Sequence, residues 1–189
     1  MAHIVPFKAV RPSKKHLQYF SSKSYKNYTE EELQNTLAKN PLSFLSIIHL
    51  KKHLSDSMTK AERYMLVKNK YEDFKVNVLS QEQDNPYDCE LKLLAASNNQ
   101  TFIVREVELI GSQRPVVIAR SLIPLTADTS EILKIGAKPL GEILFNDPEI
   151  KRGHLEVGSF NKSWARRSTF KIGKTKLLVS EIFLESLYA

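Results

Sequence analysis

Charged residues occupy positions in predicted strands where apolar side chains are expected. Side chains alternate across a strand, so Glu181 shares one face with Leu177, Val179 and Phe183. That face is otherwise apolar and therefore faces the core. Burying a carboxylate is costly unless another group pairs with it or uses it. Glu181 is thus a candidate for acid or base chemistry.

Two arginines interrupt apolar rows in the same way. Arg105 lies in the predicted strand 101–110 and Arg120 in the predicted strand 115–123, each on a row of aliphatic residues. A buried guanidinium can bind a carboxylate through two parallel hydrogen bonds, and a nearby Glu181 could pair with Arg120 or transfer a proton. The same pattern also fits structural ion pairs, and the sequence leaves both interpretations open.

Two predicted hairpins must position these three residues. One joins strands 101–110 and 115–123 through Gly111-Ser112-Gln113, and the other spans 164–184 around Gly173. Helices are expected over 29–38, 41–54, 57–70, 130–135 and 139–145, and further strands over 74–79, 91–96 and 154–157. These segments predict a sheet with helices packed on it.

Composition limits the possible functions. The chain has 189 residues, 42% hydrophobic and 26% charged, with a net charge of +7. It lacks an apolar run of membrane-spanning length and an apolar signal segment, so we expect a cytoplasmic protein without stable membrane insertion. The single Cys89 fits a reducing compartment. No phosphate-binding loop or serine-nucleophile motif occurs.

Two weaker signals lie in the first part of the chain. His49 and His53 have the i, i+4 spacing of a helical metal pair, but a third ligand is missing, so a surface pair is expected and no metal site is predicted. Residues 1–28 form a basic segment with several tyrosines and no clear periodicity. Such a segment could stack on nucleic acid, but it matches no binding motif, and no nucleic-acid partner is expected.

Six sequence blocks, in order, resemble the chorismate lyase family. They are SDSMTK at 55–60, VREVEL at 104–109, ARSLIP at 119–124, KPLGEILF at 138–145, WARRS at 164–168 and LLVSEIFL at 177–184. The resemblance implies an α+β fold, an antiparallel sheet of about six strands with helices covering one side. It covers about 45–189, so we expect an N-terminal extension at 1–40 and a lyase-like domain at 41–189.

The resemblance also implies a set of site residues. The family's substrate contacts correspond to Met58, Arg105, Leu140 and Glu181, with Glu181 as the catalytic acid or base. Arg120 is a further candidate for ligand contact. Helical segments around Met58 and Leu140 would close over the ligand.

The function implied is chorismate pyruvate-lyase activity, the cofactor-free elimination of pyruvate from chorismate to give 4-hydroxybenzoate for ubiquinone biosynthesis. A monomer with small-molecule partners only is expected. The alternative is a non-catalytic ligand-sensing domain of the same fold, as found in bacterial transcription regulators. Pyruvate formation distinguishes the two, because fold alone does not determine function.

Overall fold

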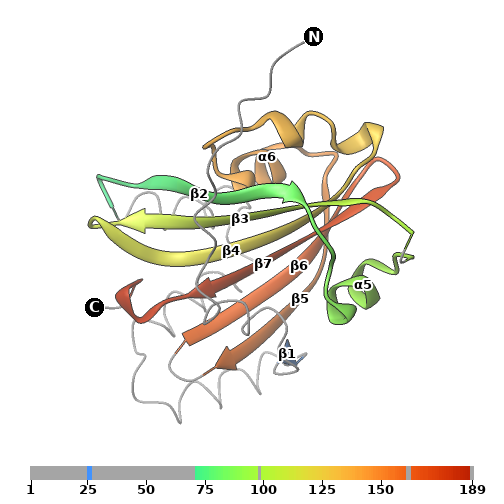
Figure 1. Cartoon of the computed structure of the whole chain (residues 1–189). Helices are drawn as coiled ribbons and strands as arrows, with labels where there is room; N and C mark the ends of the chain where they lie inside the picture. The colour runs from blue at the N-terminus through green and yellow to red at the C-terminus, as the bar shows by residue number, and fades with distance from the viewer. Residues whose placement is uncertain (1–24, 27–70, 98, 161–162, 188–189) are drawn as a thin grey trace.

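The structure, a computed structural model, describes residues 25–26, 71–97, 99–160 and 163–187 (Figure 1). Its elements are β1 (Tyr25–Lys26), β2 (Lys75–Gln83), α5 (Asp88–Leu94), β3 (Phe102–Gly111), β4 (Arg114–Pro124), the 3-10 turns η2 (Ala127–Thr129) and η3 (Ile132–Lys134), α6 (Leu140–Asn146), β5 (Lys151–Phe160), β6 (Ser163–Ile172), β7 (Thr175–Phe183) and η4 (Glu185–Leu187). The helices predicted between 29 and 70, and the boundary expected after residue 40, lie outside the described residues.

An antiparallel sheet is the centre of the fold. Its strand order is β1-β5-β6-β7-β4-β3-β2. β1 has two residues and pairs only with Gly158 and Val157 of β5, so six strands form the body of the sheet. Both predicted hairpins are present as β3–β4 and β6–β7, and β2 extends through Gln83. The predicted α+β class with about six antiparallel strands is confirmed.

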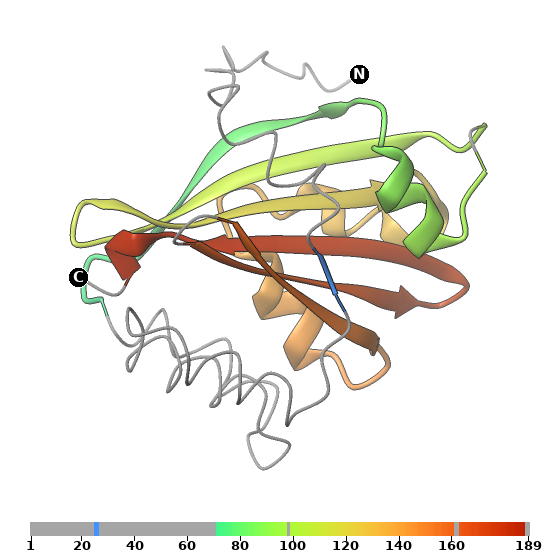
Figure 2. The ribbon, with the colours of Figure 1, turned by 90° about the horizontal axis from the view of Figure 1, so that it is seen from below.

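Helices pack on both faces of this sheet, which corrects the expectation that they cover one side. Leu140 and Leu144 of α6 pack with Phe170 and Leu177 on one face. On the other face Leu94 of α5 joins a cluster with several strand residues, which are Phe102, Val104, Leu122 and Leu178. Figure 2 shows the green α5 and the orange α6 on opposite sides of the strands.

The segment predicted as a strand at 91–96 is instead the helix α5. The side chain of Glu90 accepts a hydrogen bond from the backbone N–H of Tyr87 at 2.8 Å, which satisfies a donor at the helix start. Ala95 ends the helix in a left-handed conformation, with φ of 50°. The apolar run that suggested alternation is the core-facing side of one short helix, a known ambiguity of short apolar runs.

A β-bulge changes the register within the β3–β4 hairpin. Ile110 pairs with Pro115, but Leu109 pairs with Val117, so one residue of β4 is left over. Beyond the Leu109–Val117 pair, each β4 residue pairs with the β3 residue next to the one that the turn alone would predict. Because side chains alternate, a shift of one residue exchanges the two faces. This bulge decides where Arg120 points.

Candidate active site

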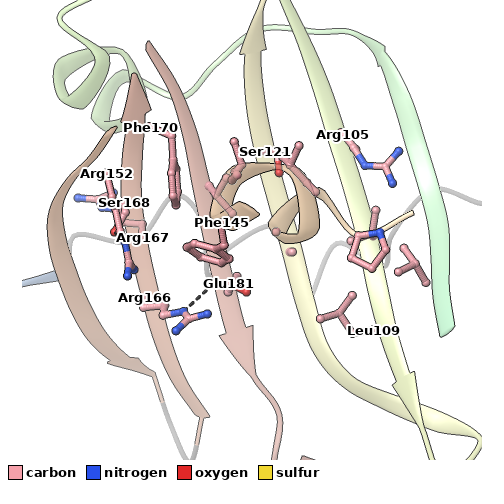
Figure 3. A pocket seen from close by; sticks show the side chains of 18 of the residues that line it. Arg105, Leu109, Ser121, Phe145, Arg152, Arg166, Arg167, Ser168, Phe170 and Glu181 are labelled. Carbon is pink, nitrogen blue, oxygen red and sulfur yellow. Dashed lines mark hydrogen bonds and ion pairs between the residues drawn. The ribbon is translucent and has the colours of Figure 1, made fainter. Parts of the chain in front are cut away.

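Two adjacent rows across the sheet form the floor of a cavity. Arg105 pairs with Ser121, which pairs with Val179. In the next row Ala119 pairs with Glu181. The cavity has a volume of about 70 Å³ and lies between this floor and α6 (Figure 3). The central strand β4 therefore contributes small side chains, which leave space between Arg105 on one side and Glu181 on the other.

Arg105 is a buried cation with neutral partners. Its side chain is 2% exposed and donates to Gln81 Oε1 at 2.6 Å, to the Gly136 carbonyl at 2.8 Å and to the Lys138 carbonyl at 3.2 Å. Burial lowers the pKa of Arg105 from its ordinary value. No carboxylate of the described residues forms an ion pair with it. An anionic ligand would supply that missing charge.

Glu181 is held at the other end of the cavity by Arg166. Arg166 Nε donates to Glu181 Oε2 at 2.5 Å, and the side chains are 7% and 22% exposed. The Arg166 guanidinium also lies 5.2 Å from the centre of the Phe183 ring. These contacts fix the orientation of the Glu181 carboxylate. Among the described side chains, Arg166 is the hydrogen-bond partner of Glu181, so Oε1 is available to a ligand.

Helix α6 covers the cavity. Leu140, at the start of this helix, is 8% exposed and lines the cavity. Phe145 makes an edge-to-face contact with Phe170, with ring centres 5.7 Å apart. The Arg152 Cζ atom lies 5.9 Å from the centre of the Phe145 ring and 5.7 Å from the centre of the Phe170 ring. The segment that leads into α6 is bonded to Arg105 through the carbonyl groups described above.

The cavity is strongly electropositive. Its described lining includes the four arginines 105, 152, 166 and 167 and a single carboxylate, that of Glu181. Arg167 is paired with Glu156 at 2.5 Å. The excess positive charge favours an anionic ligand with more than one negative group. No cluster of three or more metal-ligating side chains occurs among the described residues.

Arg120 lies on the opposite face and does not pair with Glu181. Its Nε and Nη1 donate to Glu90 and Glu106, each at 2.9 Å, and its guanidinium lies 4.5 Å from the centre of the Tyr87 ring. Burial is the largest single contribution and lowers the pKa of Arg120, but its hydrogen bonds to the two carboxylates and their negative charge together outweigh burial and raise that pKa. The bulge in the β3–β4 hairpin causes this placement.

The structure thus brings together three of the predicted site residues, Arg105, Leu140 and Glu181. Met58 lies outside the described residues. The Arg166–Glu181 pair was missed, although a signal existed. A hairpin that turns at Gly173 and pairs Ile172 with Thr175 also pairs Arg166 with Glu181, because their residue numbers have the same sum. Arg152 gave no such signal, because β5 pairs with β6 through an irregular register.

The family model and the sequence relatives agree on one family. Residues 36–189 match the family model for chorismate lyase. A probable chorismate pyruvate-lyase from Marinobacter nauticus is 40% identical over 126 residues, which cover 62% of this chain and 67% of that protein. One from Pseudoalteromonas atlantica is 30% identical over 155 residues, or 72% of this chain and 79% of the relative.

Solved structures give weaker matches. The C-terminal domain of a histidine utilization repressor from Pseudomonas syringae pv. tomato has a TM-score of 0.45 and 11% identity, and covers 61% of this chain and 94% of the domain. A transcriptional regulator of the GntR family from Bacillus cereus also has a TM-score of 0.45, with 8% identity over 62% of this chain and 96% of the regulator. On the evidence of the family model and the sequence relatives, this chain belongs to the chorismate lyase family.

Proposed function

We propose that this protein is a chorismate pyruvate-lyase, which eliminates pyruvate from chorismate and releases 4-hydroxybenzoate. Family membership supports the reaction type. The observation that carries the proposal is the placement of a buried Arg105 and an oriented Glu181 on opposite sides of a floor of small residues. The substrate is a dianion whose ring bears a carboxylate and, at the opposite ring position, a hydroxyl group. A cation and a carboxylate at opposite ends of one cavity complement that ring.

Arg105 binds the ring carboxylate in this proposal. Its guanidinium offers a planar pair of donors, a geometry that lysine does not reproduce. The acceptors now bonded to it belong to exposed residues, Gln81, Gly136 and Lys138, which can turn to water when a ligand takes their place. Two of these contacts, those with the Gly136 and Lys138 carbonyls, connect Arg105 to the segment before α6, so a ligand that displaces them changes the contacts of that segment. Binding there is therefore coupled to the position of Leu140.

Glu181 acts at the other end of the ring. In the reaction the bond between the ring carbon and the enolpyruvyl oxygen breaks, and the carbon that bears the hydroxyl loses its proton. The departing enolpyruvyl group gains a proton and becomes pyruvate. As an ion-paired carboxylate, Glu181 is an acceptor, suited to hold the ring hydroxyl and to accept the ring proton. Arg166 keeps the carboxylate in place, and its positive charge lies next to the departing carboxylate group.

The apolar cover of the site supports this chemistry by excluding water. Leu140, Leu144 and the Phe145–Phe170 pair enclose the reacting groups, and a dry site strengthens the charge interactions inside it. Met58 remains a proposed further contact. We also propose that the protein is a cytoplasmic monomer. Among the described residues, no helix has the length and apolar character that crossing a membrane requires.

The test is incubation of chelator-treated protein with chorismate, followed by separate assays of pyruvate and 4-hydroxybenzoate. Equal amounts of both products, formed without an added cofactor, are expected. A protein that binds 4-hydroxybenzoate tightly but forms no pyruvate would instead be a ligand sensor. A dependence on added metal after chelation would contradict the cofactor-free reaction.

A further inference from the structure

A second groove lies near the end of the β6–β7 hairpin, and it is lined largely by cations. Its volume is about 480 Å³, and Lys151, Lys171 and Lys176 contribute to its lining together with Arg152 and Arg167. Neither Arg105 nor Glu181 lines it. It adjoins the cavity described above, because Arg152, Arg167 and Ser168 line both.

Three lysines of this groove are direct neighbours across three strands. Lys151 of β5 pairs with Lys171 of β6, and Lys171 pairs with Lys176 of β7. Like charges that face each other across strands destabilise a sheet. Lysine on an edge strand can serve to prevent aggregation, but β6 and β7 are interior strands. The lysine row therefore requires another explanation.

Acidic side chains do not neutralise the row. Glu156 is the one carboxylate among the described lining residues, and it is bonded to Arg167. Lys151 donates to the Pro148 carbonyl at 2.9 Å. No carboxylate of the described residues forms an ion pair with Lys171 or Lys176. The groove thus keeps a positive charge of several units.

Part of the groove is rigidly built. Leu178, which is 0% exposed, lies on the same face of the sheet as the lysine row, and Ser168, which is 4% exposed, lines the groove from the side of the first cavity. Arg152 Nε donates to Ser168 Oγ at 3.1 Å, while its guanidinium lies against the Phe170 ring. In Figure 3 the Arg152 head group points away from Glu181. This arginine is therefore oriented by its neighbours before any ligand binds.

We propose that this groove is an anion-binding site, separate from the catalytic cavity, for a small ligand that carries two or more negative charges. A phosphate ester and a di- or tricarboxylate share the required chemistry. Such a ligand would relieve the repulsion along the row formed by Lys151, Lys171 and Lys176. The proposal does not depend on the reaction at Glu181.

The test uses pyrophosphate and citrate as probes, in calorimetric titrations of the full chain at low ionic strength. The groove variant is Lys171→Gln combined with Lys176→Gln. The matched control combines Lys75→Gln with Lys134→Gln, which removes the same charge from exposed lysines outside the groove. We expect saturable binding by wild type and control, weakened at least about tenfold in the groove variant. The probe that binds more tightly identifies the ligand as phosphate or carboxylate.

Two further measurements make the result decisive. The better probe should raise the melting temperature of wild type and control but not that of the groove variant, which should be at least as stable as wild type without the probe. Arg105→Ala should retain probe binding. Equal weakening in control and groove variants would show a general charge effect, and lost binding in Arg105→Ala would place the probe in the catalytic cavity. Either result, or an absence of saturable binding, would overturn the proposal.

Discussion

Replacing Arg105 with methionine should separate ligand binding from folding. Methionine is unbranched and flexible, and it fills most of the same buried space without a charge. Arg105 is 2% exposed and its guanidinium is bonded to neutral acceptors, so the folded protein carries a buried cation without an ion-pair partner among the described residues. Replacing a buried charge with a well-packed apolar side chain is often neutral or stabilising. The free energy of unfolding of Arg105→Met should therefore lie within about 1 kcal/mol of wild type.

The effect on the ligand should be much larger. A hydrogen bond to a charged group contributes about 1.5–3 kcal/mol. Its loss corresponds to a roughly 10- to 150-fold weaker affinity for 4-hydroxybenzoate. Arg120→Met is the matched control, since Arg120 is equally buried but lies on the other face with two carboxylates. It should destabilise the fold by about 3–5 kcal/mol, because Glu90 and Glu106 lose their partner.

Urea unfolding and calorimetric titration with 4-hydroxybenzoate measure these two quantities. The two variants should show opposite patterns. Arg105→Met should bind the product weakly and keep a stable fold. Arg120→Met should have a less stable fold but should still bind the product at urea concentrations below its unfolding range. An Arg105→Met protein that binds the product with wild-type affinity would refute the assignment of Arg105 as the carboxylate-binding residue. A loss of more than about 3 kcal/mol of stability would show that its main role is structural.

Four other changes test the roles proposed for the remaining residues. Glu181→Gln should reduce turnover by about two to four decades in steady-state assays while product binding falls much less, and near-normal turnover would contradict its catalytic role. Ala119→Leu should fill the cavity floor and abolish product binding in calorimetry, whereas unchanged affinity would mean that the ligand lies elsewhere. Removal of residues 1–40 should preserve turnover but lower the melting temperature, because it removes β1 from the edge of the sheet; a truncated protein that is folded but inactive would contradict this. Hydrogen bonds from the Lys174 backbone and the Thr175 side chain hold the pKa of Asp128 below its ordinary value of 3.8. The contribution of Asp128 to stability is therefore present above that pH and is lost as the pH falls through the folded-state pKa. Asp128→Asn should show a shallower decline in melting temperature between pH 7 and pH 3, and a decline equal to that of wild type would rule this out.

The sequence predicted the position of Glu181 at one end of the cavity because hairpin geometry is local. Alternation along β7 placed Glu181 among apolar residues, and the turn at Gly173, whose φ is 55°, requires a residue that tolerates a left-handed conformation. Once that turn is located, the register of β6 and β7 follows without interruption as far as Trp164 and Phe183. The partner of Glu181 could therefore have been derived from the turn alone.

The errors arose where tertiary structure overrides local pattern. Arg120 and Arg105 both interrupt apolar rows, and nothing in those rows indicates the bulge that separates them. The apolar residues between 91 and 96 fit a short strand as well as a short helix, and packing against Leu122 and Leu178 decides for the helix. The partners of Arg105 near Gly136 come from a loop whose path depends on the whole fold.

The buried cluster of Arg120, Glu90 and Glu106 bears on how the chain finds its register during folding. Without the bulge, the β3–β4 turn would align Arg120 directly opposite Arg105 on one face, with two guanidinium groups in contact. The same slip would deprive Glu90 and Glu106 of their cation beneath α5. The competing hairpin is thus destabilised in two ways, by repulsion between two guanidinium groups and by two buried carboxylates that have lost their cation. Charge in this core therefore selects one strand alignment over its neighbour, a task for which the interchangeable aliphatic residues of β3 and β4 are poorly suited.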